Sequence, residues 1–137
     1  MPTPTAAVLL ITATAVAHAQ TPAHTIAYKE PPQGTLDLAV DYPSGWKATD
    51  ARPAIIFFAG GGWTIGTIDQ FSPQAKYFAG RGMVAVRADD RTASRHHAEP
   101  EDGVEDARSA LRWIRAHAKQ LGIDPQRLVV SGGSSGG

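Results

Sequence analysis

The chain has 137 residues, and its 13 basic side chains balance its 13 acidic ones, so the formal net charge is zero with neutral histidines. This balance gives no sign of a nucleic-acid-binding surface or of a polybasic membrane-binding patch. The absence of cysteine excludes disulfides and thiolate metal sites. Apolar residues make up 42% of the chain, as in ordinary globular domains.

An alanine-rich apolar run covers residues 6–17 and ends in Ala17-His18-Ala19, a pattern typical of signal-peptide cleavage sites. The run is too short to span a bilayer of about 30 Å, and no other segment could cross a membrane. We therefore expect residues 1–19 to be a signal peptide, Gln20 to begin the mature chain, and the protein to be secreted or periplasmic. The alternative interpretation of the run is a disordered or helical tail.

Residues 20–34 are expected to form a linker and a first strand, which ends in a turn rich in proline and glycine. Leu36, Leu38 and Val40 then alternate with polar or small residues, which predicts a half-buried strand. The two segments together predict an antiparallel hairpin at a sheet edge. Residues 42–53 predict a loop, because they combine two prolines and a glycine with polar side chains.

Short apolar runs at residues 54–59, 83–86 and 128–130 are typical of strands that are buried on both faces of a parallel sheet. Between the first two runs we expect a helix from Ser72 to about Ala79, with the Ser72 hydroxyl as its cap and proline at its first position.

Residues 87–100 predict an exposed polar loop. A second helix after this loop is predicted by apolar residues at steps of three and four. The residues of this stripe are Val104, Ala107, Leu111, Ile114, Ala118 and Leu121. Helices between buried strands imply right-handed crossovers, so the predicted fold class is α/β with a mostly parallel sheet.

The last seven residues read Ser-Gly-Gly-Ser-Ser-Gly-Gly and directly follow a predicted strand. The pattern G-x-S-x-G at a strand end is typical of a nucleophile elbow, a tight turn that lifts a serine hydroxyl above the sheet. Two serines fit it, namely Ser134 with Gly132 and Gly136, and Ser135 with Gly133 and Gly137. The spacing leaves both open, and the run taken alone would also fit a flexible linker.

A second glycine run, Gly60-Gly61-Gly62, follows the first predicted buried strand. Consecutive glycines expose backbone N–H groups, which can hold the oxyanion of a tetrahedral intermediate. The glycines alone would also fit a plain turn. A phosphate-binding loop fits poorly, because no Gly-Lys-Ser/Thr follows.

Together these segments resemble the bacterial esterase/lipase branch of the α/β-hydrolase fold, near the hormone-sensitive-lipase-like and carbohydrate acetyl esterase groups. The resemblance runs from about Leu36 to Gly137. It includes the glycine loop with Trp63, the run at residues 81–86, the helix through Asp106, and the turn at residues 121–125. It implies that residues 35–137 are the N-terminal part of an α/β-hydrolase domain, truncated after the nucleophile elbow.

By matching position, the resemblance implies that Ser134 is the nucleophile, with Gly132 and Gly136 as the elbow glycines. It also implies that the N–H groups of Gly61, Gly62 and Ser135 form the oxyanion hole. Three positions depart from the family, which has a histidine in place of Ala59, an alanine in place of Ser135 and a tyrosine in place of Asp90. The resemblance implies neither a metal ion nor an organic cofactor.

In this fold the triad acid and histidine follow the serine along the chain, so we expect both beyond Gly137. The chain as given is therefore expected to lack meaningful esterase activity. We interpret His96 and His97 as solvated loop residues, with metal binding or substrate contact as the alternative, and His117 as a helix-surface residue. The remaining carboxylates of interest are interpreted as structural or surface groups, and they are Asp89, Asp90 and Asp106.

The resemblance implies a serine hydrolase that cleaves carboxylic esters through an acyl-enzyme. The expected substrates are short acyl esters, including acetyl groups on carbohydrates. Two alternatives are a peptidase of the prolyl-oligopeptidase type and a non-catalytic binding protein with a hydrolase fold. Both differ from the esterase in the sequence expected after Gly137.

Overall fold

The computed structural model describes residues 23–137, so the predicted signal peptide and Gln20 lie outside the described residues. Within these residues no helix has the length and apolar character needed to cross a membrane. The elements in chain order are β1 (His24–Lys29), β2 (Leu36–Asp41), β3 (Arg52–Phe58), α1 (Ser72–Gly80), β4 (Val84–Ala88), α2 (Ala93–His96), α3 (Pro100–Ala116), β5 (Ile123–Gly132) and the 3-10 turn η1 (Ser134–Gly136).

The strands form one sheet in the order β1-β2-β4-β3-β5. β1 and β2 make an antiparallel hairpin at one edge, and β2 is also antiparallel to β4. β3 lies between β4 and β5 and is parallel to both. The predicted α/β class and the edge hairpin are therefore confirmed, and the described part of the sheet is mixed.

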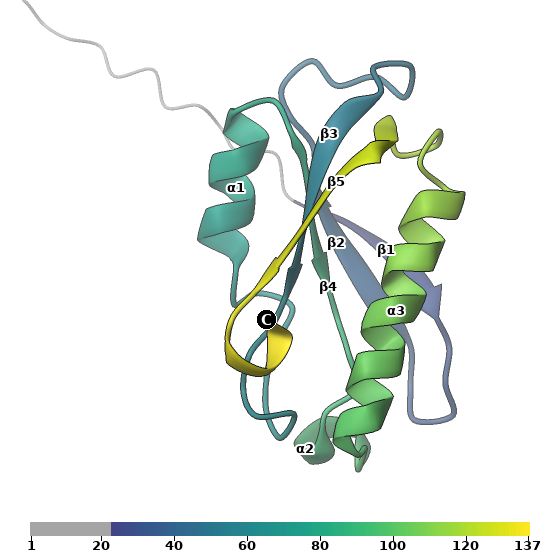
Figure 1. Cartoon of the computed structure of the whole chain (residues 1–137), viewed down its shortest axis with the longest axis vertical. Coiled ribbons are helices and arrows are strands. Elements are labelled where there is room, and N and C mark those ends of the chain that lie inside the picture. The colour runs from purple at the N-terminus through teal and green to yellow at the C-terminus, as the bar shows by residue number, and fades with distance from the viewer. Residues whose placement is uncertain (1–22) are drawn as a thin grey trace, which may run out of the picture.

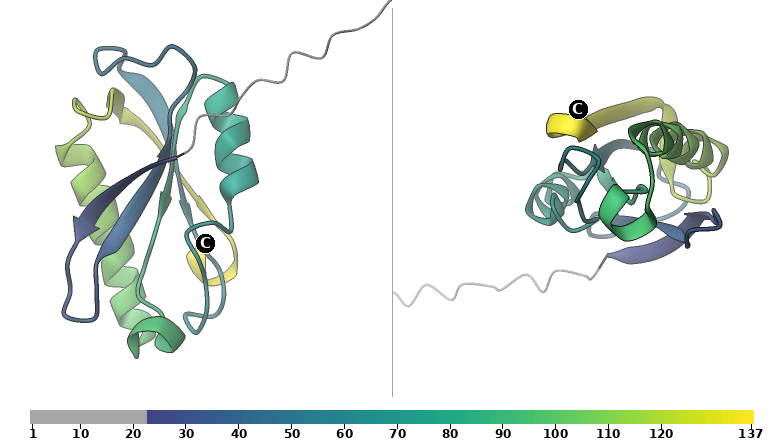
Figure 2. Two further views of the ribbon diagram at one scale, coloured as in Figure 1. Left: turned by 180° about the vertical axis from the view of Figure 1, so that it is seen from behind. Right: turned by 90° about the horizontal axis from the view of Figure 1, so that it is seen from below.

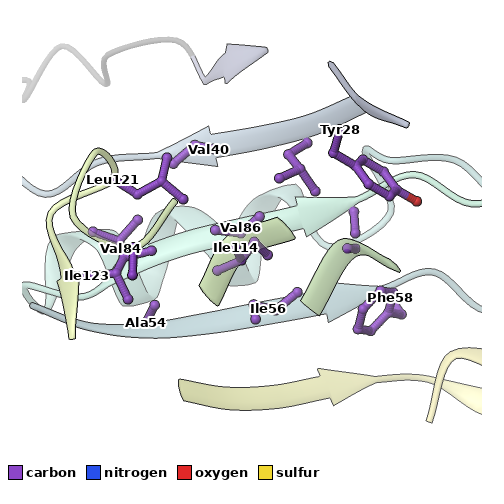
Figure 3. Packing of buried hydrophobic residues seen from close by; sticks show 14 of the residues in the cluster. Tyr28, Val40, Ala54, Ile56, Phe58, Val84, Val86, Ile114, Leu121 and Ile123 are labelled. Carbon is purple, nitrogen blue, oxygen red and sulfur yellow. The ribbon is translucent and has the colours of Figure 1, made fainter. Parts of the chain in front are cut away.

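Two helices cover opposite faces of the sheet, α1 on one side and α3 on the other (Figures 1 and 2). The larger apolar cluster joins the sheet to α3, where Ala110 and Ile114 are fully buried (Figure 3). The smaller cluster joins Ile55 and Phe57 of β3 to Ala75 and other residues of α1. Successive side chains of β3 point alternately into the two clusters, so both faces of the strand are buried and its apolar run is continuous.

Two details of the early elements differ from the prediction. The α1 helix begins at Ser72, but Phe71 is its N-cap residue and no side chain caps the first turn. β2 is buried on both faces rather than one, because Ala39 and Asp41 of its second face are also enclosed. Asp41 is buried beside Arg87 of β4, an ion pair that alternation of apolar residues does not reveal.

The segment predicted as an exposed loop at residues 87–100 is largely ordered into the fold. β4 extends to Ala88, the short helix α2 follows, and Arg91 and Thr92 are buried. The prediction was wrong here because Arg91 is buried through an ion pair with Asp106. The polar residues of this segment therefore did not reveal that part of it is buried.

The predicted stripe of α3 is partly confirmed. Ile114 is buried on the helix, and Ala118 and Leu121 are buried after it, because α3 ends at Ala116 and not at Gly122. Val104 is 42% exposed, and the buried residues in the first turns are instead Gly103 and Asp106. In its first turns the helix contacts the rest of the molecule through the ion pair of Asp106 with Arg91 and through close packing at Gly103. A search for periodic apolar residues detects neither kind of contact.

The strand that leads to the elbow also differs from the prediction. β5 begins at Ile123, and its register against β3 shifts before Leu128 pairs with Ala54. It is the edge strand opposite β1 in the described sheet, and its Val129 and Val130 remain about half exposed. The prediction of a strand buried on both faces is therefore wrong for the described residues.

Candidate active site

The turn after β5 is as tight as an elbow requires. Ser134 has a φ of +55°, in the left-handed region that non-glycine residues adopt mainly under constraint. A Cβ atom at Gly132 would collide with the Gly136 carbonyl, and a Cβ atom at Gly136 would collide with the carbonyl oxygens of Phe58 and Ala59. These two positions therefore admit only glycine while the turn keeps this shape.

The glycine loop after β3 is held in an unusual backbone conformation. Gly61 has a φ of +149°, and a Cβ atom there would collide with the carbonyl of Ile65. Gly62 and Trp63 follow with φ values of +62° and +57°. A positive φ at a bulky residue such as Trp63 stores strain, a feature that clusters at functional sites.

The elbow and the glycine loop meet at one end of the sheet, because β3 and β5 are parallel and their carboxyl ends lie together (Figure 1). The N–H groups of Gly61 and Gly62 donate hydrogen bonds to the side-chain oxygen of Ser135, at 3.1 Å and 3.0 Å. Two backbone donors thus converge on a single oxygen position beside Ser134. This is the geometry that stabilises an oxyanion.

The loop is held by contacts that the sequence did not reveal. The N–H of Gly60 donates to the Gln70 side-chain carbonyl at 2.6 Å, from ten residues further along the chain. The N–H groups of Ala93 and Ser94, in the first turn of α2, donate to the carbonyls of Trp63 and Thr64 at 2.9 Å and 3.0 Å. No sequence signal distinguishes Gln70 from any other loop glutamine.

The segment that carries α2 is itself anchored by a buried ion pair. The Asp106 carboxylate, fully enclosed on α3, accepts hydrogen bonds from the Arg91 backbone and guanidinium and from Lys29 at distances between 2.7 Å and 3.0 Å. Burial opposes its ionisation, but these bonds hold the pKa of Asp106 below its usual value. Of the three carboxylates interpreted as structural or surface groups, Asp106 is thus buried and paired.

The other two differ in their surroundings. Asp89 forms a bidentate ion pair with Arg95 of α2. Asp90 lines a cavity of about 540 Å³ together with Trp63, Val104 and Ser135. Burial, with the nearby Asp89 charge, raises the pKa of Asp90 to about 6. The cavity therefore contains a carboxyl group whose ionisation is disfavoured by its surroundings.

α3 comes close to the site at Gly103. A Cβ atom there would lie 3.2 Å from Trp63 Cδ1 and 3.3 Å from the Asp90 carboxylate. Both distances are tighter than ordinary van der Waals contact. The missing side chain lets the helix pack against the strained part of the glycine loop.

The histidines of interest lie in the α2 region and at the end of α3. His97 is exposed, whereas His96 is partly buried and its Nδ1 atom accepts the Thr92 N–H at 3.1 Å. His117 stacks on Trp113 at the C-terminal end of α3. Within residues 23–137 no three or more histidine, aspartate or glutamate side chains gather as metal ligands.

Comparison with known proteins places these features in a family. The BD-FAE family model matches residues 38–137. The carboxylesterase NlhH of Mycobacterium tuberculosis is 38% identical over 89 residues, which make up 64% of this chain and 27% of that protein. The esterase LipI of the same organism is 33% identical over 114 residues, or 74% of this chain and 35% of that protein.

Solved structures agree with the sequence matches. The thermophilic esterase Est2 of Thermogutta terrifontis has a TM-score of 0.82 and is 51% identical, covering 86% of this chain and 43% of that chain. The chain thus spans less than half the length of these relatives. The elbow and the glycine loop both fall within residues 38–137, which the family model matches. The chain belongs to the BD-FAE family and carries part of the α/β-hydrolase fold.

Proposed function

We propose that the full-length protein containing residues 1–137 is a serine carboxylesterase with Ser134 as its nucleophile. The observation that carries this proposal is the pair of N–H groups, from Gly61 and Gly62, that converge on one oxygen position beside a serine in a left-handed turn. The similar proteins NlhH and LipI are named as esterases, which favours ester hydrolysis over the peptidase alternative.

In the proposed reaction the Ser134 oxygen attacks the ester carbonyl carbon and its proton passes to a histidine. The charge that develops on the carbonyl oxygen is stabilised by the N–H groups of Gly61, Gly62 and Ser135. The alcohol leaves, and water then hydrolyses the acyl-enzyme. The histidine and its carboxylate partner are proposed to follow Gly137, in the chain order of this fold.

We propose short acyl esters as the substrate class, with acetylated carbohydrates as the natural candidate. Est2 has been solved with propionate and with butyrate bound, which supports a preference for small acyl groups. The test compares p-nitrophenyl acetate, butyrate and octanoate, acetylated xylan, and a proline p-nitroanilide. A higher kcat/KM for octanoate than for acetate would contradict the short-acyl proposal, and anilide cleavage without ester cleavage would support the peptidase.

The nucleophile is tested with a fluorophosphonate probe and peptide mapping. Est2 has been observed phosphonylated by sarin, so this chemistry suits the fold. We expect the probe on Ser134 and no labelling of Ser134→Ala. Labelling of Ser135, or labelling that survives Ser134→Ala, would contradict the assignment. A folded protein that neither reacts nor hydrolyses esters would support the non-catalytic alternative.

We also propose that the protein is exported, with cleavage between Ala19 and Gln20. The support is the apolar run and the small-x-small pattern at residues 17–19. N-terminal sequencing of the protein recovered outside the cytoplasm is expected to begin at Gln20. An intact Met1 on protein confined to the cytoplasm would contradict the proposal.

A further inference from the structure

The Ser135 side chain has a place in the site that the sequence did not predict. The sequence assigned only its backbone N–H to the oxyanion hole, but its hydroxyl oxygen accepts the N–H groups of both Gly61 and Gly62. A hydroxyl oxygen has two lone pairs, and both are engaged here. The position that an oxyanion would take is therefore filled by an oxygen of the protein.

We propose that the Ser135 hydroxyl is an internal occupant of the oxyanion site that competes with the ester carbonyl. This inference rests on the proposed esterase function. Oxyanion donors act at 2.7–3.1 Å from the reacting oxygen, and the Ser135 oxygen lies at 3.0 Å and 3.1 Å from the same two donors. Two oxygens cannot share this position, so the Ser135 side chain must rotate to another staggered rotamer before substrate enters.

The geometry favours an occupant over an additional donor. A hydroxyl that donates to the oxyanion would have to lie about 2.5–3.0 Å away from it, whereas the Ser135 oxygen occupies the position itself. In the free enzyme the Ser135 oxygen takes the place that water would otherwise fill at these two N–H groups, because Gly62 is exposed and Gly61 is only partly buried. The oxyanion of the transition state displaces it more readily than a neutral ester carbonyl does, because a charged oxygen accepts hydrogen bonds more strongly than a neutral one.

The competition has a measurable size. If the rotamer that leaves the site open is a minority state, the apparent affinity for substrate falls by its population. An open fraction on the order of 10–30% corresponds to a roughly three- to tenfold loss in kcat/KM. Ser135→Ala removes the hydroxyl and is expected to recover this factor. Ser135→Thr keeps the hydroxyl and is expected to show no such gain.

The experiment uses the full-length protein and two readouts, with Ser44→Ala in an exposed turn as the matched control. The first readout is kcat/KM for p-nitrophenyl acetate, which should rise in Ser135→Ala and stay unchanged in Ser44→Ala. The second is the amide proton shift of Gly61 and Gly62 after ¹⁵N-glycine labelling. Both signals should move upfield in free Ser135→Ala, as an amide proton does when mobile water replaces a fixed acceptor.

Two results would overturn the inference. One is a kcat/KM of folded Ser135→Ala at or below wild type, which would mean that the hydroxyl assists the reaction or plays no part in it. The other is the absence of any change in the two glycine signals. A failure of the proposed esterase function would be distinguishable from a failure of this inference. If the function is wrong, the wild type shows no Ser134-dependent hydrolysis, but the Gly61 and Gly62 signals still report whether the Ser135 hydroxyl fills the site.

Discussion

Replacement of Asp106 by alanine should destabilise the protein by about 3 kcal/mol. Its carboxylate accepts hydrogen bonds from the Arg91 backbone and guanidinium and from Lys29. The Arg91 side chain is only 8% exposed, so the alanine variant leaves a buried guanidinium without its main partner. Breaking such a pair costs about 3–5 kcal/mol. We expect the lower end, because Asp102 remains 3.2 Å from the guanidinium.

The measurement is urea unfolding of the full-length protein, read as a lower midpoint at an unchanged m-value. Glu30→Ala, at an exposed position, is the control and should fall within about 0.5 kcal/mol of wild type. A loss below about 1 kcal/mol for Asp106→Ala would refute the reasoning, since it would mean that Arg91 finds water or another partner at little cost.

The same pair gives a pH dependence of known sign. The folded-state pKa of Asp106 is lowered, so the ionised carboxylate stabilises the folded state. This contribution to the free energy of unfolding is fully present above the unfolded-state pKa of about 3.9, and it is lost as the pH falls through the folded-state pKa. Wild-type stability should therefore fall more steeply below pH 4 than that of Asp106→Asn. Parallel curves for the two proteins in this range would contradict the lowered pKa.

Four further outcomes are expected. Gln70→Ala removes the acceptor of the Gly60 N–H and should lower kcat roughly tenfold with little change in KM, whereas Gln70→Glu, which keeps an acceptor, should lose less. Asp90→Asn should raise kcat/KM above pH 6, where the wild-type carboxylate adds negative charge to the cavity, and the gain should vanish below pH 6; an equal ratio at all pH values would contradict this. Burial raises the pKa of Asp41, so the folded state holds this proton more tightly and ionisation of Asp41 lowers stability as the pH rises above about 3.9; wild-type stability should fall relative to that of Asp41→Asn over this rise in urea unfolding, and parallel curves would contradict it. Residues 20–137 expressed alone should show no Ser134-dependent turnover of p-nitrophenyl acetate, since a serine without a positioned base is a weak nucleophile, and turnover abolished by Ser134→Ala would refute this.

Sequence patterns predicted the parts of the fold that depend on burial of apolar side chains. The continuous apolar run of β3 and the periodic stripe around Ile114 gave the correct element types, because burial on two faces or on one helix face leaves a visible period. The parallel order of β3 and β5 then followed from the helices between them. This order brings the elbow and the glycine loop together.

The contacts that the sequence did not reveal are polar and join distant residues. Arg91 and Asp41 are buried because partners on other elements neutralise them, and polarity by itself predicted exposure for the segment around Arg91. Gln70 reaches Gly60, and Ser135 reaches Gly61, through side-chain oxygens whose direction depends on the folded backbone. Single-sequence patterns carry no record of such pairings, since they arise only once the loop has its shape.

A side chain at position 103 would affect both the stability of α3 and the shape of the active site. Alanine in a helix interior is favoured over glycine by about 1 kcal/mol, so helix propensity alone would favour alanine at this position. The added methyl group would press on Trp63 and on the Asp90 carboxylate at 3.2–3.3 Å, which would displace the loop that presents Gly61 and Gly62. Engineering that raises the melting temperature through this helix would therefore tend to lose turnover, a trade-off between stability and activity located at one backbone position.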